Sequence, residues 1–161
     1  MKKWLGWLLL GSLSLWAEQV EVVADRFSAD ETKLRSEFVG NVKVTKGKDV
    51  LVANQVVITF DEKRQPLKYV ATGNAEATVT LKDKTYFVKG QKLTYEPSTL
   101  RYTVEKDAFL HEKETDKKVY GDVITVNQTQ GTYEVDGKAS KPVKFIFQVE
   151  EKKQTQKEET K

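Results

Sequence analysis

The chain has 161 residues, with 27 Lys and Arg against 24 Asp and Glu, one His and no Cys, and this length predicts a single domain. The absence of Cys excludes a disulfide framework, a thiol nucleophile, a lipidated Cys anchor and a Cys zinc site, and a single His excludes sites built from several His ligands. Hydrophobic residues make up 39% and charged residues 32%, so we expect a modest or one-sided core and no polytopic membrane protein.

The first 17 residues differ in composition from the rest. Lys2 and Lys3 precede an uncharged apolar run from Trp4 to Ala17, which is typical of a secretory signal peptide cleaved after Ala17. The run is shorter than the roughly 18 to 20 residues of a membrane-spanning helix. Leu15 stands where cleavage sites prefer a small residue, so a retained N-terminal anchor is the alternative. Cleavage lowers the net charge from +3 to +1.

The opposite end is strongly polar. Residues 150–161 contain four Glu, four Lys and no apolar residue, so they bury too little surface to offset their ordering entropy. We therefore expect a signal peptide over 1–17, a folded domain over 18–149 and a disordered charged tail over 150–161.

Between these ends the apolar residues alternate with period two. The runs 41–45, 55–60 and 143–149 are examples, and no comparable period of 3.6 occurs. Polar turn sequences separate the runs, so the fold class is all-β with about ten or more short strands. The predicted turns are 45–49, 61–66, 82–84, 96–99, 112–118 and 127–131.

A longer repeat organises these strands. Four units begin at Ala24, Ala53, Gly90 and Gly121, each with a small residue followed by a polar one and an alternating strand. A turn and a second strand follow, and the second strand reaches a Gly-Asn-like step. These steps are Gly40-Asn41, Gly73-Asn74, Lys106-Asp107 and Gly137-Lys138. One hairpin-like unit is therefore stacked four times with turns of different length.

Aligning the four units predicts an apolar interior between two opposed sheet faces. The first strands supply one face and the second strands the other, with Ala71, Ala75 and Ala77 as small residues that leave room. The stack leaves apolar edges at 19–24 and 143–149, and these are covered by loops or the tail, or are paired head-to-tail with another chain. The predicted edge residues are Val20, Val22, Phe145 and Phe147.

The Ala-Asp and Ala-Asn strand starts, the Phe-Val-Gly-Asn-Val-Lys-Val strand at 38–44 and the Ala-Thr-Gly-Asn-Ala strand at 71–75 resemble the OstA-like family of periplasmic lipopolysaccharide-transport proteins. The resemblance covers roughly 20–139. It implies an open, twisted, V-shaped antiparallel β-jellyroll whose interior shields the acyl chains of lipid A. The residues it assigns to lipid binding are Phe27, Phe38, Val42, Val56, Ile58, Phe60, Leu93, Tyr95, Val104, Leu110, Ile124 and Val126.

The resemblance also implies partners and a place in the cell. The chain is expected in the periplasm and associates head-to-tail with itself. At one end of the resulting bridge stands an inner-membrane-anchored, LptC-like protein of the same fold, and at the other the periplasmic domain of an LptD-like outer-membrane translocon. The alternatives are the membrane-anchored member of the same pathway and a structural β-solenoid with a dry core.

Other chemistry finds little support in the residues. His111-Glu112-Lys113-Glu114 lacks the second His of a zinc peptidase motif, and no phosphate-binding glycine loop occurs. The lysines are dispersed among glutamates, so a nucleic-acid partner is not expected. We therefore predict no enzyme activity, no catalytic residue, no metal and no cofactor.

Overall fold

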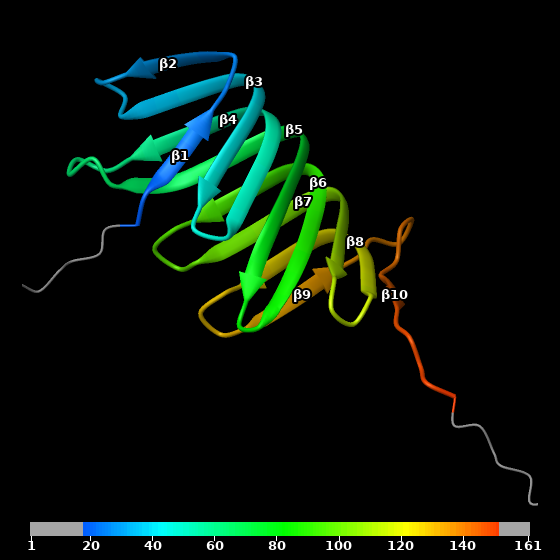
Figure 1. The fold of residues 1–161 in the computed structure, drawn as a ribbon. Helices are drawn as coiled ribbons and strands as arrows, with labels where there is room; N and C mark the ends of the chain where they lie inside the picture. The colour runs from blue at the N-terminus through cyan, green and yellow to red at the C-terminus, as the bar shows by residue number, and fades with distance from the viewer. Residues whose placement is uncertain (1–17, 152–161) are drawn as a thin grey trace, which may run out of the picture.

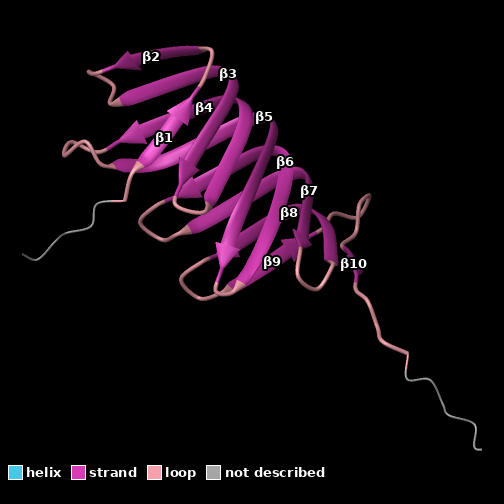
Figure 2. Ribbon diagram, viewed as in Figure 1, coloured by secondary structure: helices cyan, strands magenta, loops and turns pink. Residues whose placement is uncertain are grey.

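The computed structural model describes residues 18–151, and the predicted signal peptide and most of the predicted tail lie outside this range. The described residues form strands without any helix, which confirms the all-β prediction (Figure 2). The strands are β1 (Val20–Val23), β2 (Arg26–Asp30), β3 (Arg35–Lys46), β4 (Asp49–Phe60), β5 (Pro66–Leu81), β6 (Lys84–Glu96), β7 (Arg101–Glu112), β8 (Lys117–Asn127), β9 (Thr132–Asp136) and β10 (Lys144–Ile146).

All strand pairs are antiparallel and belong to one ten-stranded sheet. Its order is β1-β3-β4-β5-β6-β7-β8-β10, with β2 also pairing with β3 and β9 also pairing with β8. Sequence neighbours are thus spatial neighbours, and the stack runs from β2 at one end to β10 at the other (Figure 1). The sheet does not close on itself, as expected for an open jellyroll.

The six central strands are long because each one bends and continues. They contain 11 to 16 residues, whereas we predicted short strands throughout. The register shifts near the middle of every central pair, for example between Val39 and Val42 of β3, and the β4–β5 pair shifts a second time between Thr59 and Phe60. The bends fold the sheet into two facing layers joined along a spine, in the shape of a V (Figure 1).

Each layer takes one half of every central strand. The β2–β9 layer, named by its edge strands, contains β2, β9 and the strand halves next to the turns at 31–34, 61–65, 97–100 and 128–131. The β1–β10 layer contains β1, β10 and the halves next to the turns at 47–48, 82–83 and 113–116. The predicted first strands do share one layer, the β2–β9 layer. The second strands of the first three predicted units begin in that same layer and cross the spine into the β1–β10 layer, so the prediction that second strands form a separate face was wrong.

The repeated sequence motif forms the spine. At the first three Gly-Asn-like steps both residues have a positive φ, a conformation that glycine and asparagine adopt most readily. The polar residue at the start of each unit contacts the step of the same unit: Asp25 accepts from Asn41 at 2.9 Å, Asn54 lies against Gly73, Gln91 donates to Asp107 at 3.2 Å, and Asp122 pairs with Lys138 at 3.1 Å. At the fourth step the chain turns toward β10 through a bridge between Lys138 and Lys141.

Candidate functional site

The core lies between the two layers and holds most of the predicted interior residues. Its inward side chains come from both halves of the bent strands, as the alternation of buried and partly exposed positions in β4 to β8 shows. Nine of the twelve predicted residues are buried there: Val42, Val56, Ile58, Leu93, Tyr95, Val104, Leu110, Ile124 and Val126.

The other three predicted residues mark the N-terminal end of the interior. Phe38 and Phe60 are partly buried against the core, whereas Phe27 is 60% exposed. Phe27 lies on β2, the edge strand of its layer, so no further strand covers it. Its ring lies 4.9 Å from that of Phe38, centroid to centroid. The interior is therefore open to solvent at this end.

The small residues of β5 are all buried, and one of them marks a close approach of strands. They are Ala71, Ala75 and Ala77, and Ala75 is paired with Gly90 on β6. A Cβ added at Gly90 would lie 2.5 Å from Cγ1 of Val104. Small side chains at this point thus allow close packing beside the spine.

The side of the V opposite the spine is open, and we call it the mouth. Three tyrosines of the β2–β9 layer form a row along the mouth. Tyr69, Tyr95 and Tyr102 are direct cross-strand neighbours on β5, β6 and β7. Their ring centroids are 5.7 Å and 4.4 Å apart, and the second pair is stacked. Burial raises the pKa of Tyr69 and of Tyr102, and for Tyr102 the nearby Asp49 carboxylate adds to the shift. Tyr69 and Tyr102 therefore present neutral hydroxyls at the mouth.

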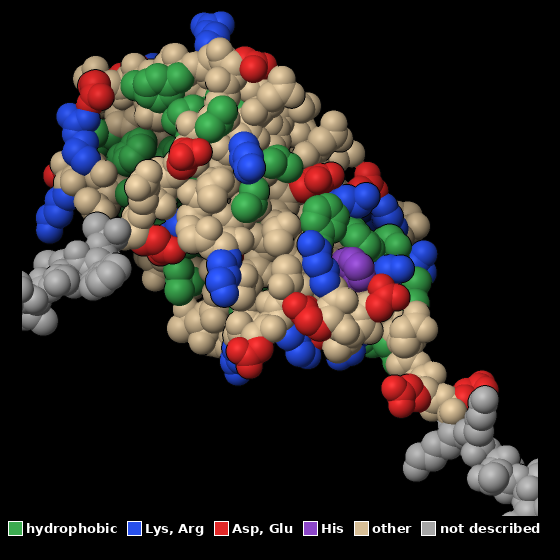
Figure 3. Space-filling model, in the orientation of Figure 1, with side chains coloured by type: hydrophobic (Ala, Val, Ile, Leu, Met, Phe, Trp, Pro, Cys, Tyr) green, Lys and Arg blue, Asp and Glu red, His purple; other side chains and the backbone are tan. Residues whose placement is uncertain are grey.

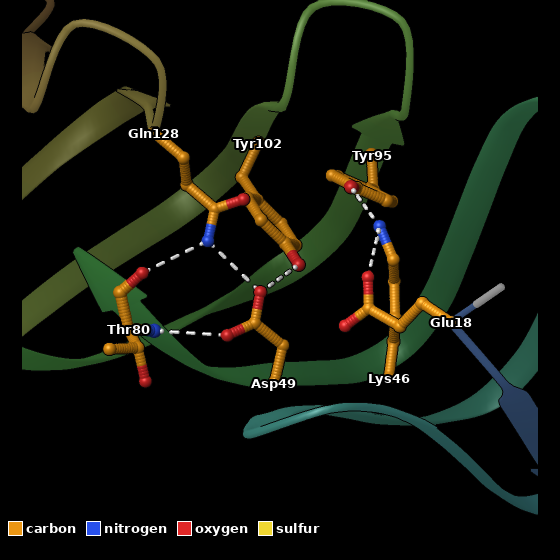
Figure 4. Close-up of polar contacts among 7 residues, drawn as sticks. All are labelled: Glu18, Lys46, Asp49, Thr80, Tyr95, Tyr102 and Gln128. Carbon is orange, nitrogen blue, oxygen red and sulfur yellow. Dashed lines mark hydrogen bonds and ion pairs between the residues drawn. The ribbon is translucent and has the colours of Figure 1, made fainter. Parts of the chain in front are cut away.

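Polar side chains of the β1–β10 layer meet this row across the mouth (Figure 4). The Tyr102 hydroxyl donates to Oδ2 of Asp49 at 3.1 Å, and the Gln128 amide donates to the same oxygen at 3.0 Å. The Lys46 ammonium donates to the Tyr95 hydroxyl at 3.3 Å and lies 3.7 Å from the Glu18 carboxylate. The mouth is thus bridged by hydrogen bonds directly above an apolar interior.

A buried carboxylate, Glu112, was not predicted from the sequence. It is 1% exposed and forms ion pairs with Lys84 at 2.6 Å and Lys117 at 3.8 Å. The Glu112 carboxylate holds the pKa of Lys84 above its usual value. Burial, and then the same carboxylate, raises the pKa of Tyr86 and Tyr133. The sequence predicts Glu112 in the turn 112–118, but the residue continues the inward phase of Ala108 and Leu110 at the end of β7. That alternation is the signal by which it could be found.

The predicted edge residues lie at opposite edges of one layer. Val20 and Val22 belong to β1 and Phe145 to β10, with Phe147 just beyond it. Phe145 and Phe147 are 49% and 54% exposed, and apolar side chains gather at both ends of the molecule in Figure 3. The predicted strand over 143–149 is shorter than expected, since only Lys144–Ile146 pairs with β8.

Other kinds of site find no support in the part of the chain that the structure describes. Residues 18–151 contain no group of three or more His, Cys, Asp or Glu that could hold a metal ion. Nor do they include a helix that is long and apolar enough to span a membrane. His111, predicted in a turn, lies on β7 and contacts Asp116 at 2.8 Å.

Comparison with known proteins agrees with this architecture. The family described as "LptA/(LptD N-terminal domain) LPS transport protein" matches residues 11–132. Among solved structures, the fold is similar to that of LptH, the LptA-homologous periplasmic component of the lipopolysaccharide transport device of Pseudomonas aeruginosa, with a TM-score of 0.74 and 15% identity over 82% of this chain and 96% of that chain. No curated protein matches the chain. The family match confirms the resemblance predicted from the repeats, and the structural match confirms the jellyroll fold.

Proposed function

We propose that this chain, which belongs to the LptA/(LptD N-terminal domain) LPS transport protein family, carries lipopolysaccharide as a component of a periplasmic bridge between the inner and outer membranes. The family is a non-enzymatic transport component, in agreement with the absence of catalytic motifs predicted from the sequence. The proposal concerns binding and shielding of a lipid, with no chemical step.

The observation that carries the proposal is the apolar interior between two layers that are covalently continuous at the spine and joined at the mouth by a few polar contacts. Inward residues from β3 to β8 line it along the whole stack, and the N-terminal end is open at Phe27. An acyl chain that leaves water gains about 0.8 kcal/mol for each buried methylene. Several long chains therefore cross an aqueous compartment at a useful rate only inside such a shield, while the sugars and phosphates stay in water at the mouth.

Assembly head-to-tail is part of the proposal, and the edges support it. β1 and β10 are opposite edges of the same layer and carry unpaired backbone groups next to exposed apolar side chains. A β10 edge that pairs with the β1 edge of another copy makes a contact that extends and does not close. By the same logic, LptC-like and LptD-like domains of the same fold are the proposed partners at the two ends.

Site-specific photo-crosslinking in cells tests lipid binding. Tyr95 and Phe87 are both aromatic residues of β6, but Tyr95 faces the interior and Phe87 lies on the outer surface next to Phe109. A photoreactive phenylalanine at Tyr95 should capture lipopolysaccharide, and the same group at Phe87 should not. Equal capture at the two positions, or none at Tyr95 with normal protein levels, would contradict binding in the interior.

A structural module with a dry core is the second candidate, because the interior is well filled. Leu93, Val104 and Ile124 are each 0% exposed. Purified protein that fails to deplete labelled lipopolysaccharide from solution would favour this candidate. Depletion that saturates at a fixed molar ratio would favour the carrier.

A further inference from the structure

The contacts across the mouth carry an inference about how a ligand moves through the molecule. We propose that Asp49, Tyr102 and Gln128 form a latch across the mouth, and that an amphiphile with its acyl chains inside and its polar head outside passes along the interior only when this latch opens. The inference rests on the proposed function, because it assumes that the interior holds acyl chains.

The latch joins parts of the chain that are far apart in sequence and lie on different layers. Asp49 is the first residue of β4 in the β1–β10 layer, whereas Tyr102 on β7 and Gln128 after β8 belong to the β2–β9 layer. Oδ2 of Asp49 accepts from Tyr102 at 3.1 Å and from Gln128 at 3.0 Å. Gln128 also donates to the Thr80 carbonyl oxygen at 3.1 Å, which adds a third bond across the mouth (Figure 4).

Asp49 is held in place from its own side. Its other carboxylate oxygen accepts the Thr80 backbone N–H at 3.0 Å, so the side chain is fixed on β5 while Oδ2 reaches across. The Lys46–Tyr95 contact lies beside it and uses the neighbouring tyrosine of the row. The latch groups are therefore preorganised to bridge the layers, and Asp49 is not simply a solvated turn residue.

The position of the latch makes it an obstacle for a moving ligand. Tyr102 is buried among the tyrosine row, and the row is part of the core. A polar head of sugars and phosphates cannot follow the acyl chains into this interior without a large desolvation cost. It must travel along the mouth, and so it has to pass between Asp49 on one side and Tyr102 and Gln128 on the other.

The chain offers a clean way to measure opening without any lipid. It has no Cys, so a single Ala71→Cys substitution in the buried interior gives one reporter thiol. Tyr102→Phe removes one hydrogen bond to a charged acceptor and keeps the ring, and we expect thiol labelling to accelerate about tenfold. Tyr69→Phe is the matched control, since the Tyr69 hydroxyl makes no hydrogen bond among the described residues; its labelling rate should change less than about twofold.

Urea unfolding of the Tyr102→Phe and Tyr69→Phe variants shows whether the reagent reaches the thiol by local opening of the mouth or by global unfolding. If Tyr102→Phe accelerates labelling by more than its loss of global stability explains, the mouth opens locally, as proposed. If the labelling rates of the two variants are equal, or follow global stability alone, Tyr102 is only a structural brace and the latch is refuted.

A reversible crosslink then tests the role of the latch in lipid passage. Asp49→Cys with Gln128→Cys, joined by a short bifunctional thiosulfonate, should slow uptake of labelled lipopolysaccharide at least tenfold, and reductant should restore it. Asp61→Cys with Gln65→Cys is the control pair, because these residues contact each other within one turn and do not span the mouth. Undiminished uptake with the latch crosslinked would overturn the proposal. No uptake by the native chain would instead refute the proposed function, and the thiol labelling would still decide whether the latch controls opening.

Discussion

The spine depends on Gly73, and Gly73→Ala tests how far the bend of β5 needs a residue without a side chain. The backbone of Gly73 has φ +78°. A Cβ placed there would lie 2.6 Å from Nδ2 and 2.8 Å from Cβ of Asn54, the polar residue that starts the same repeat unit. The substitution therefore combines a strained backbone with a clash against a neighbouring strand.

The backbone strain and the clash with Asn54 each lower the stability by an amount that can be estimated. The left-handed backbone costs alanine about 1 to 2 kcal/mol relative to glycine. Displacing the Asn54 side chain at its Cβ, which cannot rotate away, adds about 1 to 3 kcal/mol as overpacking does in a core. We expect Gly73→Ala to lower the free energy of unfolding by roughly 2 to 5 kcal/mol. At about 4 °C for each kcal/mol, the midpoint temperature should fall by roughly 8 to 20 °C.

Urea unfolding followed by far-ultraviolet circular dichroism measures this loss, with Gly47→Ala as the control. Gly47 has φ +58°, but an added Cβ would meet only the end of the flexible Glu18 side chain, with Oε1 at 2.7 Å. Gly47→Ala should therefore cost only the backbone share, about 1 to 2 kcal/mol. If the two variants lose the same stability, the spine does not require close approach at Gly73, and the argument from the Asn54 contact is wrong.

Leu93→Ala, at a fully buried position, should lower the free energy of unfolding by about 2 to 5 kcal/mol in urea titrations, and a smaller loss would show that the interior collapses around the cavity. Phe147→Asp should abolish concentration-dependent lengthening in sedimentation velocity, whereas Leu67→Asp, equally exposed but away from β1 and β10, should not. The Thr85 backbone N–H of β6 holds the pKa of Glu114 below its usual 4.5. This carboxylate therefore contributes stability that is present above pH 4.5 and is lost as the pH falls through the lower folded pKa. In Glu114→Gln the free energy of unfolding should fall less steeply with pH in that window. The intact mass of the exported protein should correspond to a chain that begins at Glu18, and a mass that includes residues 1–17 would support the retained anchor.

The strands and turns were largely predictable because they are local properties. Alternation with period two, together with the repeat, located part of every central strand. The polar sequences at 61–66, 82–84 and 127–131 contain turns that the structure places within a residue or two of the prediction. A strand can end at a Gly-Asn step or bend there and continue. Alternation does not distinguish the two cases, because the apolar residues on both sides of the step keep the same phase in each. The sequence therefore predicted short strands where the chain forms long bent ones.

The alternation of apolar residues predicted which positions are buried in the middle of the strand stack, but not which are buried at its ends. Buried positions such as Leu93 and Val104 follow directly from the alignment of the four units. Phe27 has the same phase and is exposed, because burial at the end of a stack depends on whether another strand follows. The latch could not be predicted from the sequence either, because Asp49 and Gln128 are 79 positions apart and meet only when the layers fold together.

The spine explains how a chain with a modest apolar fraction encloses a long apolar interior. Because β3 to β8 each bend, one strand supplies inward side chains to both layers, and the outer faces remain free to carry charged residues. The bend also places β1 and β10 at opposite edges of one layer and β2 and β9 at opposite edges of the other. A second copy added in the proposed head-to-tail manner therefore meets both layers at once. Pairing of β10 with β1 then continues one wall of the interior and brings β9 and β2 together to continue the other, so that sheet and interior extend in the same step.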